Sequence, residues 1–122
     1  MTEFVSRATL RSAAKLRGVG VRFGGEIELS LAPTEIGAGL MLERADLGVS
    51  WPLDLAHTQP GPGCTMSGES EAAVHFVEHV LAALVGCGVS DCAVSVDGPE
   101  MPLLDGSALP LVEAIREAYN FI

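Results

Sequence analysis

The chain has 122 residues, a formal net charge of −9 and 48% apolar residues. This length predicts one domain with a single core. The negative charge argues against a nucleic acid partner, because phosphates would be repelled. No apolar run approaches the roughly 20 residues that span a bilayer. Residues 1–15 lack a basic segment followed by an apolar block, so we expect a cytoplasmic protein without stable membrane insertion.

The basic side chains gather near the start of the chain, where five of the seven fall: Arg7, Arg11, Lys15, Arg17 and Arg22. This grouping is typical of a solvated strand face. The more specific alternative is that these residues contact a phosphate or a protein partner. The three cysteines form no C-x-x-C pair, which argues against a disulfide framework and a structural zinc knot. Cys87 and Cys92 lie in apolar surroundings and are expected to be buried thiols.

The first third of the chain predicts strands. Residues 8–17 alternate irregularly up to a Gly-Val-Gly turn signal. Residues 26–31 alternate strictly, with Ile27, Leu29 and Leu31 on one face, which is typical of a half-buried strand.

Two further strands and a loop are expected next. Residues 39–43 form a short apolar run, and residues 49–55 form another that Pro52 makes an edge strand or an interrupted one. The composition of residues 59–68 predicts a loop.

The spacing between apolar residues then changes from two residues to three and four. This spacing predicts an amphipathic helix over residues 71–85, capped by Ser70 and ended by Gly86 and Gly88. The apolar stripe of this helix would consist of Val74, Val77, Leu81 and Leu84.

The last third predicts a strand, an extended link and a helix. Residues 92–96 are the strand, residues 101–104 the link and residues 108–119 the helix, with Asp105 or Ser107 as its cap. The apolar stripe of that helix would consist of Leu109, Val112, Ile115 and Tyr119.

Grouped strands followed by helices indicate an α+β fold, a mainly antiparallel sheet with two helices on one face. The other sheet face would need polar residues or a partner.

The most informative segment for chemistry is the run His75-Phe76-Val77-Glu78-His79. It matches H-x-x-E-H, the inverted zinc-peptidase motif. On a helix, His75 and His79 would share a face and could hold one Zn²⁺, with Glu78 activating water. The plainer interpretation is that His75 and His57 are ordinary surface histidines.

A wider set of motifs resembles the UDP-3-O-acyl-N-acetylglucosamine deacetylase (LpxC) family. The clearest is Val77-Glu78-His79 followed by an apolar helix and Gly86-Cys87-Gly88. The other blocks occur in the family's order: residues 9–10, 18–21, 31–33, 44–47, 64–67 and 100–108. The resemblance covers residues 1–122 as a single domain that is similar to the family's N-terminal half.

The resemblance implies a zinc-dependent amide hydrolase of lipid A biosynthesis. Glu78 would be the general base, His79 one zinc ligand and Thr65 a substrate contact, with a UDP-linked aminosugar as ligand. The family's second domain, which supplies the other zinc ligands, is absent from these residues. We therefore expect an incomplete Zn²⁺ site and no activity of the chain alone.

Two departures from the family pattern bear on the site. Arg22 stands where the family has a His, and an arginine could meet a phosphate. Phe76 stands where the family has a Thr, and the helix formers before it predict an earlier helix start. His75 and His79 would then be i, i+4 neighbours and could form a second, local metal site that the family lacks.

The sequence is also compatible with other functions. The chain could form a homodimer that completes a metal site, or receive the missing ligands from a separate chain. It could also be a non-enzymatic binding or regulatory module, or a small H-x-x-E-H metal-binding protein.

Overall fold

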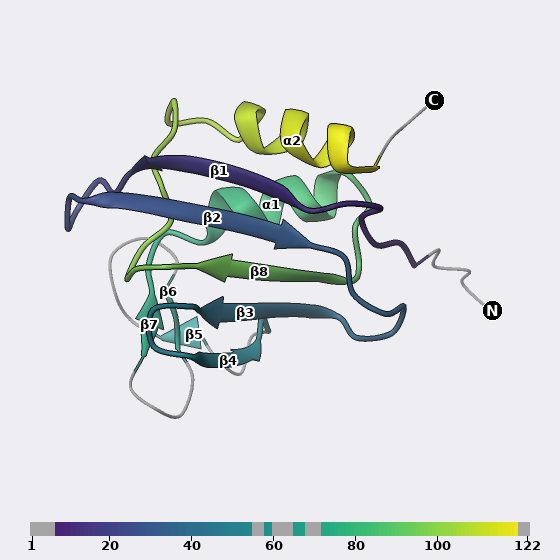
Figure 1. The fold of residues 1–122 in the computed structure, drawn as a ribbon, viewed down its shortest axis with the longest axis horizontal. Coiled ribbons are helices and arrows are strands. Elements are labelled where there is room, and N and C mark those ends of the chain that lie inside the picture. Colours follow the sequence, from purple (N-terminus) through teal and green to yellow (C-terminus); the bar gives the residue numbers. More distant parts are fainter. Residues whose placement is uncertain (1–6, 55–57, 60–64, 68–71, 120–122) are drawn as a thin grey trace.

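The computed structural model describes residues 7–54, 58–59, 65–67 and 72–119 of the chain. Within them it confirms the α+β class, with a five-stranded, mainly antiparallel sheet and two helices (Figure 1). No helix in these ranges is both long and apolar enough to cross a membrane.

The large sheet has the spatial order β1-β2-β8-β3-β4. Neighbouring strands are antiparallel except for β3 and β8, which run parallel. The late strand β8 therefore lies between two earlier hairpins and joins them. The strands are β1 (Ala14–Val19), β2 (Glu26–Ala32), β3 (Leu40–Arg44), β4 (Val49–Pro52) and β8 (Cys92–Val96).

Alternation along the central strands creates the core face of the sheet. Ile27, Leu29 and Leu31 of β2 are buried, as their spacing predicts, and β8 buries every second residue from Cys92. Burying an aliphatic side chain completely contributes about 1.5–3 kcal/mol, so this face carries much of the stability.

Both helices cover that face, as predicted. They are α1 (Glu78–Gly86) and α2 (Leu109–Tyr119), which contact each other, while α2 also contacts β1 (Figure 1). The helices bury one stripe each against the sheet, consisting of Val80, Ala83 and Leu84 in α1, and Leu111, Ile115 and Ala118 in α2. The predicted stripe of α2 is wrong in part, because Leu109 is 58% exposed.

The opposite sheet face carries polar residues. Arg17 of β1 forms ion pairs with Glu26 and Glu28 of β2, each at 3.0 Å, and Ser95 of β8 donates a hydrogen bond to Glu43 of β3. Part of the basic group near the start of the chain is thus neutralised within the sheet. Exposed pairs of this kind add little stability but keep the face hydrated.

The predicted start of the first helix is wrong. Helix α1 begins at Glu78 with Val77 as its N-cap residue, seven residues after the expected start, while Ser70 lies outside the described residues. Ala73–Val74 instead forms strand β7, and His75 makes a β-bridge with Glu100. Long-range pairing of this segment replaces the local helical hydrogen bonds.

The predicted loop over residues 59–68 is also wrong in part. Thr58–Gln59 is strand β5 and Thr65–Ser67 is strand β6, and with β7 they form a small antiparallel sheet. The capping prediction for α2 is confirmed, because the Ser107 hydroxyl accepts a hydrogen bond from the Leu109 N–H at 3.2 Å.

The two cysteines in the described ranges are free thiols. Cys92 is fully buried, as predicted, whereas Cys87 is only partly buried. Burial raises the pKa of Cys92 to about 11. This thiol stays protonated at neutral pH and acts as an apolar core residue.

Candidate active site

Glu78 and His79 are the first two residues of α1, and both side chains are solvent-exposed. The N-cap residue Val77 makes no side-chain capping hydrogen bond, and Glu78 places a carboxylate in the first turn, near the positive end of the helix dipole. A carboxylate and an imidazole on adjacent residues can act on the same water molecule or metal ion.

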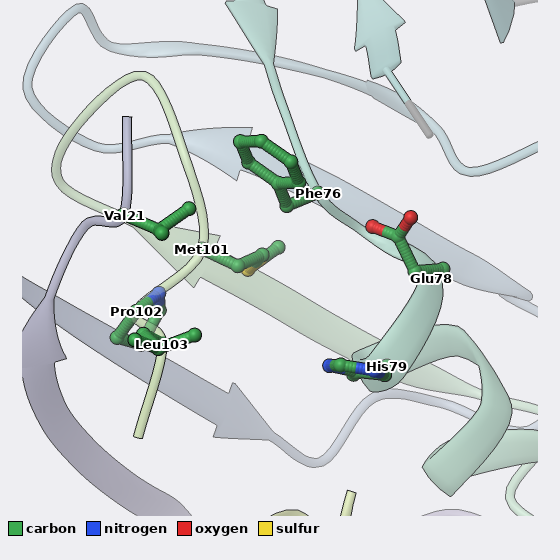
Figure 2. A pocket seen from close by; sticks show the side chains of 7 residues that line it. All are labelled: Val21, Phe76, Glu78, His79, Met101, Pro102 and Leu103. Carbon is green, nitrogen blue, oxygen red and sulfur yellow. The ribbon is translucent and has the colours of Figure 1, made fainter. Parts of the chain in front are cut away.

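These two side chains line a pocket of about 190 Å³. Figure 2 shows Glu78 and His79 at one side and the apolar side chains of two other segments across from them. The remaining lining residues are Val21 from the β1–β2 turn, Phe76 from just before α1, and Met101, Pro102 and Leu103 from the link after β8. The pocket thus places an apolar wall opposite a carboxylate and an imidazole.

Phe76 makes the sharp change from extended chain to helix. Its φ angle is +62°, in the left-handed region that L-residues seldom occupy. Such backbone geometry persists only where the surroundings enforce it. Here the bridge of His75 to Glu100 and the burial of Val77 hold the two sides of the turn.

His75 is held in extended structure and not on α1. Its N–H donates to the Pro99 carbonyl at 2.9 Å, and its carbonyl accepts from the Met101 N–H at 3.1 Å. The ring lies 5.3 Å from the ring of Phe23, between centroids. Burial lowers the pKa of His75, an effect that the nearby Glu100 opposes and that Arg22 and Arg44 reinforce.

His75 was predicted to be a zinc ligand on the basis of a helical position, and that helical position is wrong. A helical spacing of four residues requires both histidines on one helix, and only His79 belongs to α1. Within the described ranges, no three side chains of the His, Cys, Asp or Glu type gather closely enough to hold a metal ion. Glu78 and His79 fit one part of a zinc centre, which takes about three protein ligands.

Glu100 is a fully buried carboxylate beside the pocket. Its oxygens accept hydrogen bonds from the backbone N–H groups of Arg22, at 3.0 Å, and Phe23, at 2.7 Å. Charge-assisted bonds of this kind compensate the desolvation of a buried carboxylate.

The structure brings together Glu78 and His79, while their catalytic and metal-binding roles remain predictions. Thr65 lies in β6, but its side chain lies outside the described part of the chain, so its contact with substrate also remains a prediction. His57 lies outside the described residues as well.

Sequence reasoning missed the apolar wall and Glu100. The link over residues 101–104 was expected to be extended and apolar, yet nothing in its local pattern shows which residues it faces. Glu100 lies in one of the blocks that resemble the deacetylase family, and that block was the available signal.

Comparison with known proteins agrees with these features. The family described as UDP-3-O-acyl N-acetylglycosamine deacetylase (LpxC) matches residues 7–120. The chain therefore belongs to the UDP-3-O-acyl-N-acetylglucosamine deacetylase family.

Several bacterial deacetylases of that name are similar in sequence. The one from Citrifermentans bemidjiense is 38% identical over 117 residues, covering 93% of this chain and 38% of the relative. That from Anaeromyxobacter dehalogenans is 42% identical over 113 residues, covering 93% and 37%. That from Vibrio vulnificus is 35% identical over 117 residues, covering 93% and 38%. The chain thus spans well under half the length of these relatives.

Proposed function

We propose that this chain provides the general base and one zinc ligand of a UDP-3-O-acyl-N-acetylglucosamine deacetylase of lipid A biosynthesis. The supporting observation is the position of Glu78 and His79, side by side at the start of α1 and facing an apolar wall, in a chain of this family. The site would act in the cytoplasm on the N-acetyl group of a UDP-linked acylated aminosugar.

The chemistry assigned to this chain is proton transfer and ligation. The Glu78 carboxylate would accept a proton from the water that attacks the amide carbonyl, and would then return it to the leaving amine. A neutral His79 imidazole would hold Zn²⁺ through one ring nitrogen. When bound, the metal would supply positive charge that stabilises the developing oxyanion and acidifies water. The apolar wall would exclude water from the other side of the reacting amide.

The remaining metal ligands must come from other residues. We propose that a second segment, present in the uncovered part of the relatives, packs near α1 and completes the centre. A second copy of this chain is the alternative partner, which the exposed apolar residues Val85 of α1 and Leu109 of α2 favour. If the chain instead has a non-enzymatic binding role, a different protein would cover the same surface.

Complementation in trans tests the proposal. The part of the Anaeromyxobacter dehalogenans deacetylase that this chain does not cover is added to the chain with Zn²⁺ and UDP-3-O-acyl-N-acetylglucosamine. We expect acetate release with the wild-type chain, a loss of at least about a hundredfold with Glu78→Gln, and a similar loss with His79→Ala. Glu35→Gln, at an exposed carboxylate outside the pocket, is the matched control and should retain activity.

Native mass spectrometry of the chain alone separates the alternatives. We expect a monomer that holds no zinc at equimolar metal and releases no acetate. A dimer that holds zinc would favour completion of the site by a second copy. The variant His75→Ala should leave zinc stoichiometry unchanged in every state, and a loss of zinc would restore His75 as a ligand.

A further inference from the structure

Three segments that are distant in sequence form the pocket, and all three meet at Glu100. The β1–β2 turn supplies Val21, the segment entering α1 supplies Phe76 and Glu78, and the link after β8 supplies Met101. Glu100 directly precedes this last segment, and its side chain is 0% exposed. One buried residue therefore bonds the β1–β2 turn, forms a β-bridge with His75 before α1, and directly precedes Met101.

The side chain of Glu100 holds the β1–β2 turn. Its two oxygens accept from the consecutive backbone N–H groups of Arg22 and Phe23 at 3.0 and 2.7 Å. A neutral amide has one acceptor oxygen and an NH₂ group, so a glutamine in the same orientation would keep one of the two bonds and turn a donor toward the other N–H. The turn thus depends on a carboxylate at this position.

Gly20 provides the space for that carboxylate. A methyl group added at Gly20 would overlap the carboxylate of Glu100. The turn and the carboxylate are therefore packed directly against each other. Substitution of Gly20 can therefore disturb the same contact as substitution of Glu100.

The main chain next to Glu100 holds the other two walls together. His75 exchanges backbone hydrogen bonds with Pro99 and Met101, at 2.9 and 3.1 Å, and Leu103 donates from its N–H to the Val19 carbonyl at 3.0 Å. These bonds fix the segment that leads into Glu78 and His79. The turn that carries Val21 is fixed separately, by the hydrogen bonds of the Glu100 carboxylate.

We propose that Glu100 is a positioning residue that fixes the Gly20–Phe23 turn through its carboxylate and thereby holds Val21 as the apolar wall of the pocket across from Glu78 and His79. This inference deepens the proposed function, on which it depends for the identity of the substrate. The resulting pocket would accept a small amide whose alkyl part lies on Val21 and Leu103. Loss of the carboxylate would free the turn and widen the pocket without removing Glu78 or His79.

Backbone amide exchange measured by NMR on the full chain tests the positioning itself. In Glu100→Gln, we expect exchange of the Arg22 or Phe23 amide to accelerate by about tenfold or more relative to the wild type. The matched control is Asp91→Asn, which removes another buried carboxylate that accepts two backbone N–H bonds, from Gly37 and Gly39. It should leave the exchange of Arg22 and Phe23 unchanged relative to the core amides. Unchanged exchange at both amides in Glu100→Gln would overturn the proposal.

Binding of a small probe tests the consequence for the pocket. N-butylacetamide is titrated while the methyl signals of Val21 and Leu103 are followed. We expect saturable shifts in the wild type and in Asp91→Asn, and an affinity several-fold weaker in Glu100→Gln. Equal affinity in Glu100→Gln would overturn the proposal. Absence of shifts in the wild type would count against the proposed amide substrate, and the exchange measurement would still decide the role of Glu100.

Gly20→Ala provides an independent test if Glu100→Gln does not fold. The added methyl displaces the carboxylate without removing it, so the Arg22 and Phe23 amides should again exchange faster. If Glu100→Gln does fold, combining the two substitutions should add little to either alone, because both act on one contact. Additive effects would show that the carboxylate and the turn act separately, which contradicts the proposal.

Discussion

Asp91 shows how one buried carboxylate can join several parts of the chain. It accepts hydrogen bonds from the backbone N–H groups of Gly37, at 3.0 Å, and Gly39, at 2.7 Å. The Ser90 hydroxyl donates to it at 2.8 Å, and the Arg7 guanidinium binds it at 2.6 Å. The first described residues, the β2–β3 connection and the start of β8 therefore all depend on a negative charge at one position.

Folding stability should depend on the ionisation of Asp91. The hydrogen bond from Arg7, aided by the backbone and Ser90 donors, holds the pKa of Asp91 well below its ordinary value, against the opposing effect of burial. Unfolded Asp titrates near about 3.9. The stabilisation is therefore fully present above that pH and is lost as the pH falls toward the lower pKa of the folded state.

Urea unfolding between pH 7 and pH 3 checks this expectation. The wild type should lose stability below about pH 4, and Asp91→Asn should be less stable at pH 7 but lose less on acidification. Comparing the two proteins cancels the contributions of Asp46 and Asp105, whose pKa values are also lowered by their hydrogen-bonding partners Arg44 and Ser107. Parallel pH profiles would contradict the role of Asp91.

At the scale of elements, the segment before α1 shows where sequence reasoning succeeds and fails. Val74 and Val77 are three residues apart and are both fully buried, so the apolar pattern is correct. The same spacing arises here from a strand, a bridge and a turn. Periodicity records burial and cannot distinguish a helix from an extended segment whose hydrogen-bond partners, Pro99 and Met101, lie far along the sequence.

Other elements follow their local patterns closely. The alternation of β2 and the position of α2 were predicted because one face of each is buried and the other solvated. The small sheet formed by β5, β6 and β7 was missed because Gly and Pro dominate the composition around it. Glu78 and His79 could be selected from a motif, whereas the pocket wall depends on tertiary contacts that no local signal specifies.

The left-handed conformation of Phe76 gives a prediction for this element. Phe76→Gly and Phe76→Ala remove nearly the same side-chain contacts. Only glycine also relieves the backbone strain at a φ angle of +62°. We expect the glycine variant to be more stable than the alanine variant by about 1 kcal/mol. Chemical denaturation of the two variants provides the measurement.

A control at Ala82, an exposed position inside α1, should show the opposite order. There, Ala82→Gly should destabilise by about 1 kcal/mol because glycine is a poor helix former. A Phe76→Gly variant that is less stable than Phe76→Ala would show that the backbone at residue 76 is not strained.

At the scale of the whole molecule, one core carries the stability. The sheet and both helices contribute to a single cluster of buried residues, while Val85 and Leu109 remain exposed on the helices. The domain is small, so the loss of a few core contacts is a large fraction of its stability. The exposed helix residues contribute little until another surface covers them.

Two leucine substitutions measure this difference. Leu31→Ala, at a fully buried position of β2, should lower the free energy of unfolding by about 2–5 kcal/mol. Leu109→Ala, at an exposed position, should change it by no more than about 0.5 kcal/mol in the monomer. Guanidinium unfolding at low and high protein concentration checks both values. A large, concentration-dependent effect of Leu109→Ala would instead place this residue in an interface between copies.

The central position of β8 constrains the order in which the chain can fold. The β1–β2 and β3–β4 hairpins form from neighbouring residues, but they do not pair with each other, and β8 supplies the ladder between them. During synthesis, two separate hairpins would therefore exist until the residues of α1 and β8 have left the ribosome. Insertion of one late strand between two early ones is a step of long sequence separation, and such steps are slow. Until it occurs, the inner edges of β2 and β3 remain open to pairing with other chains, and nascent molecules are most prone to aggregate in that interval.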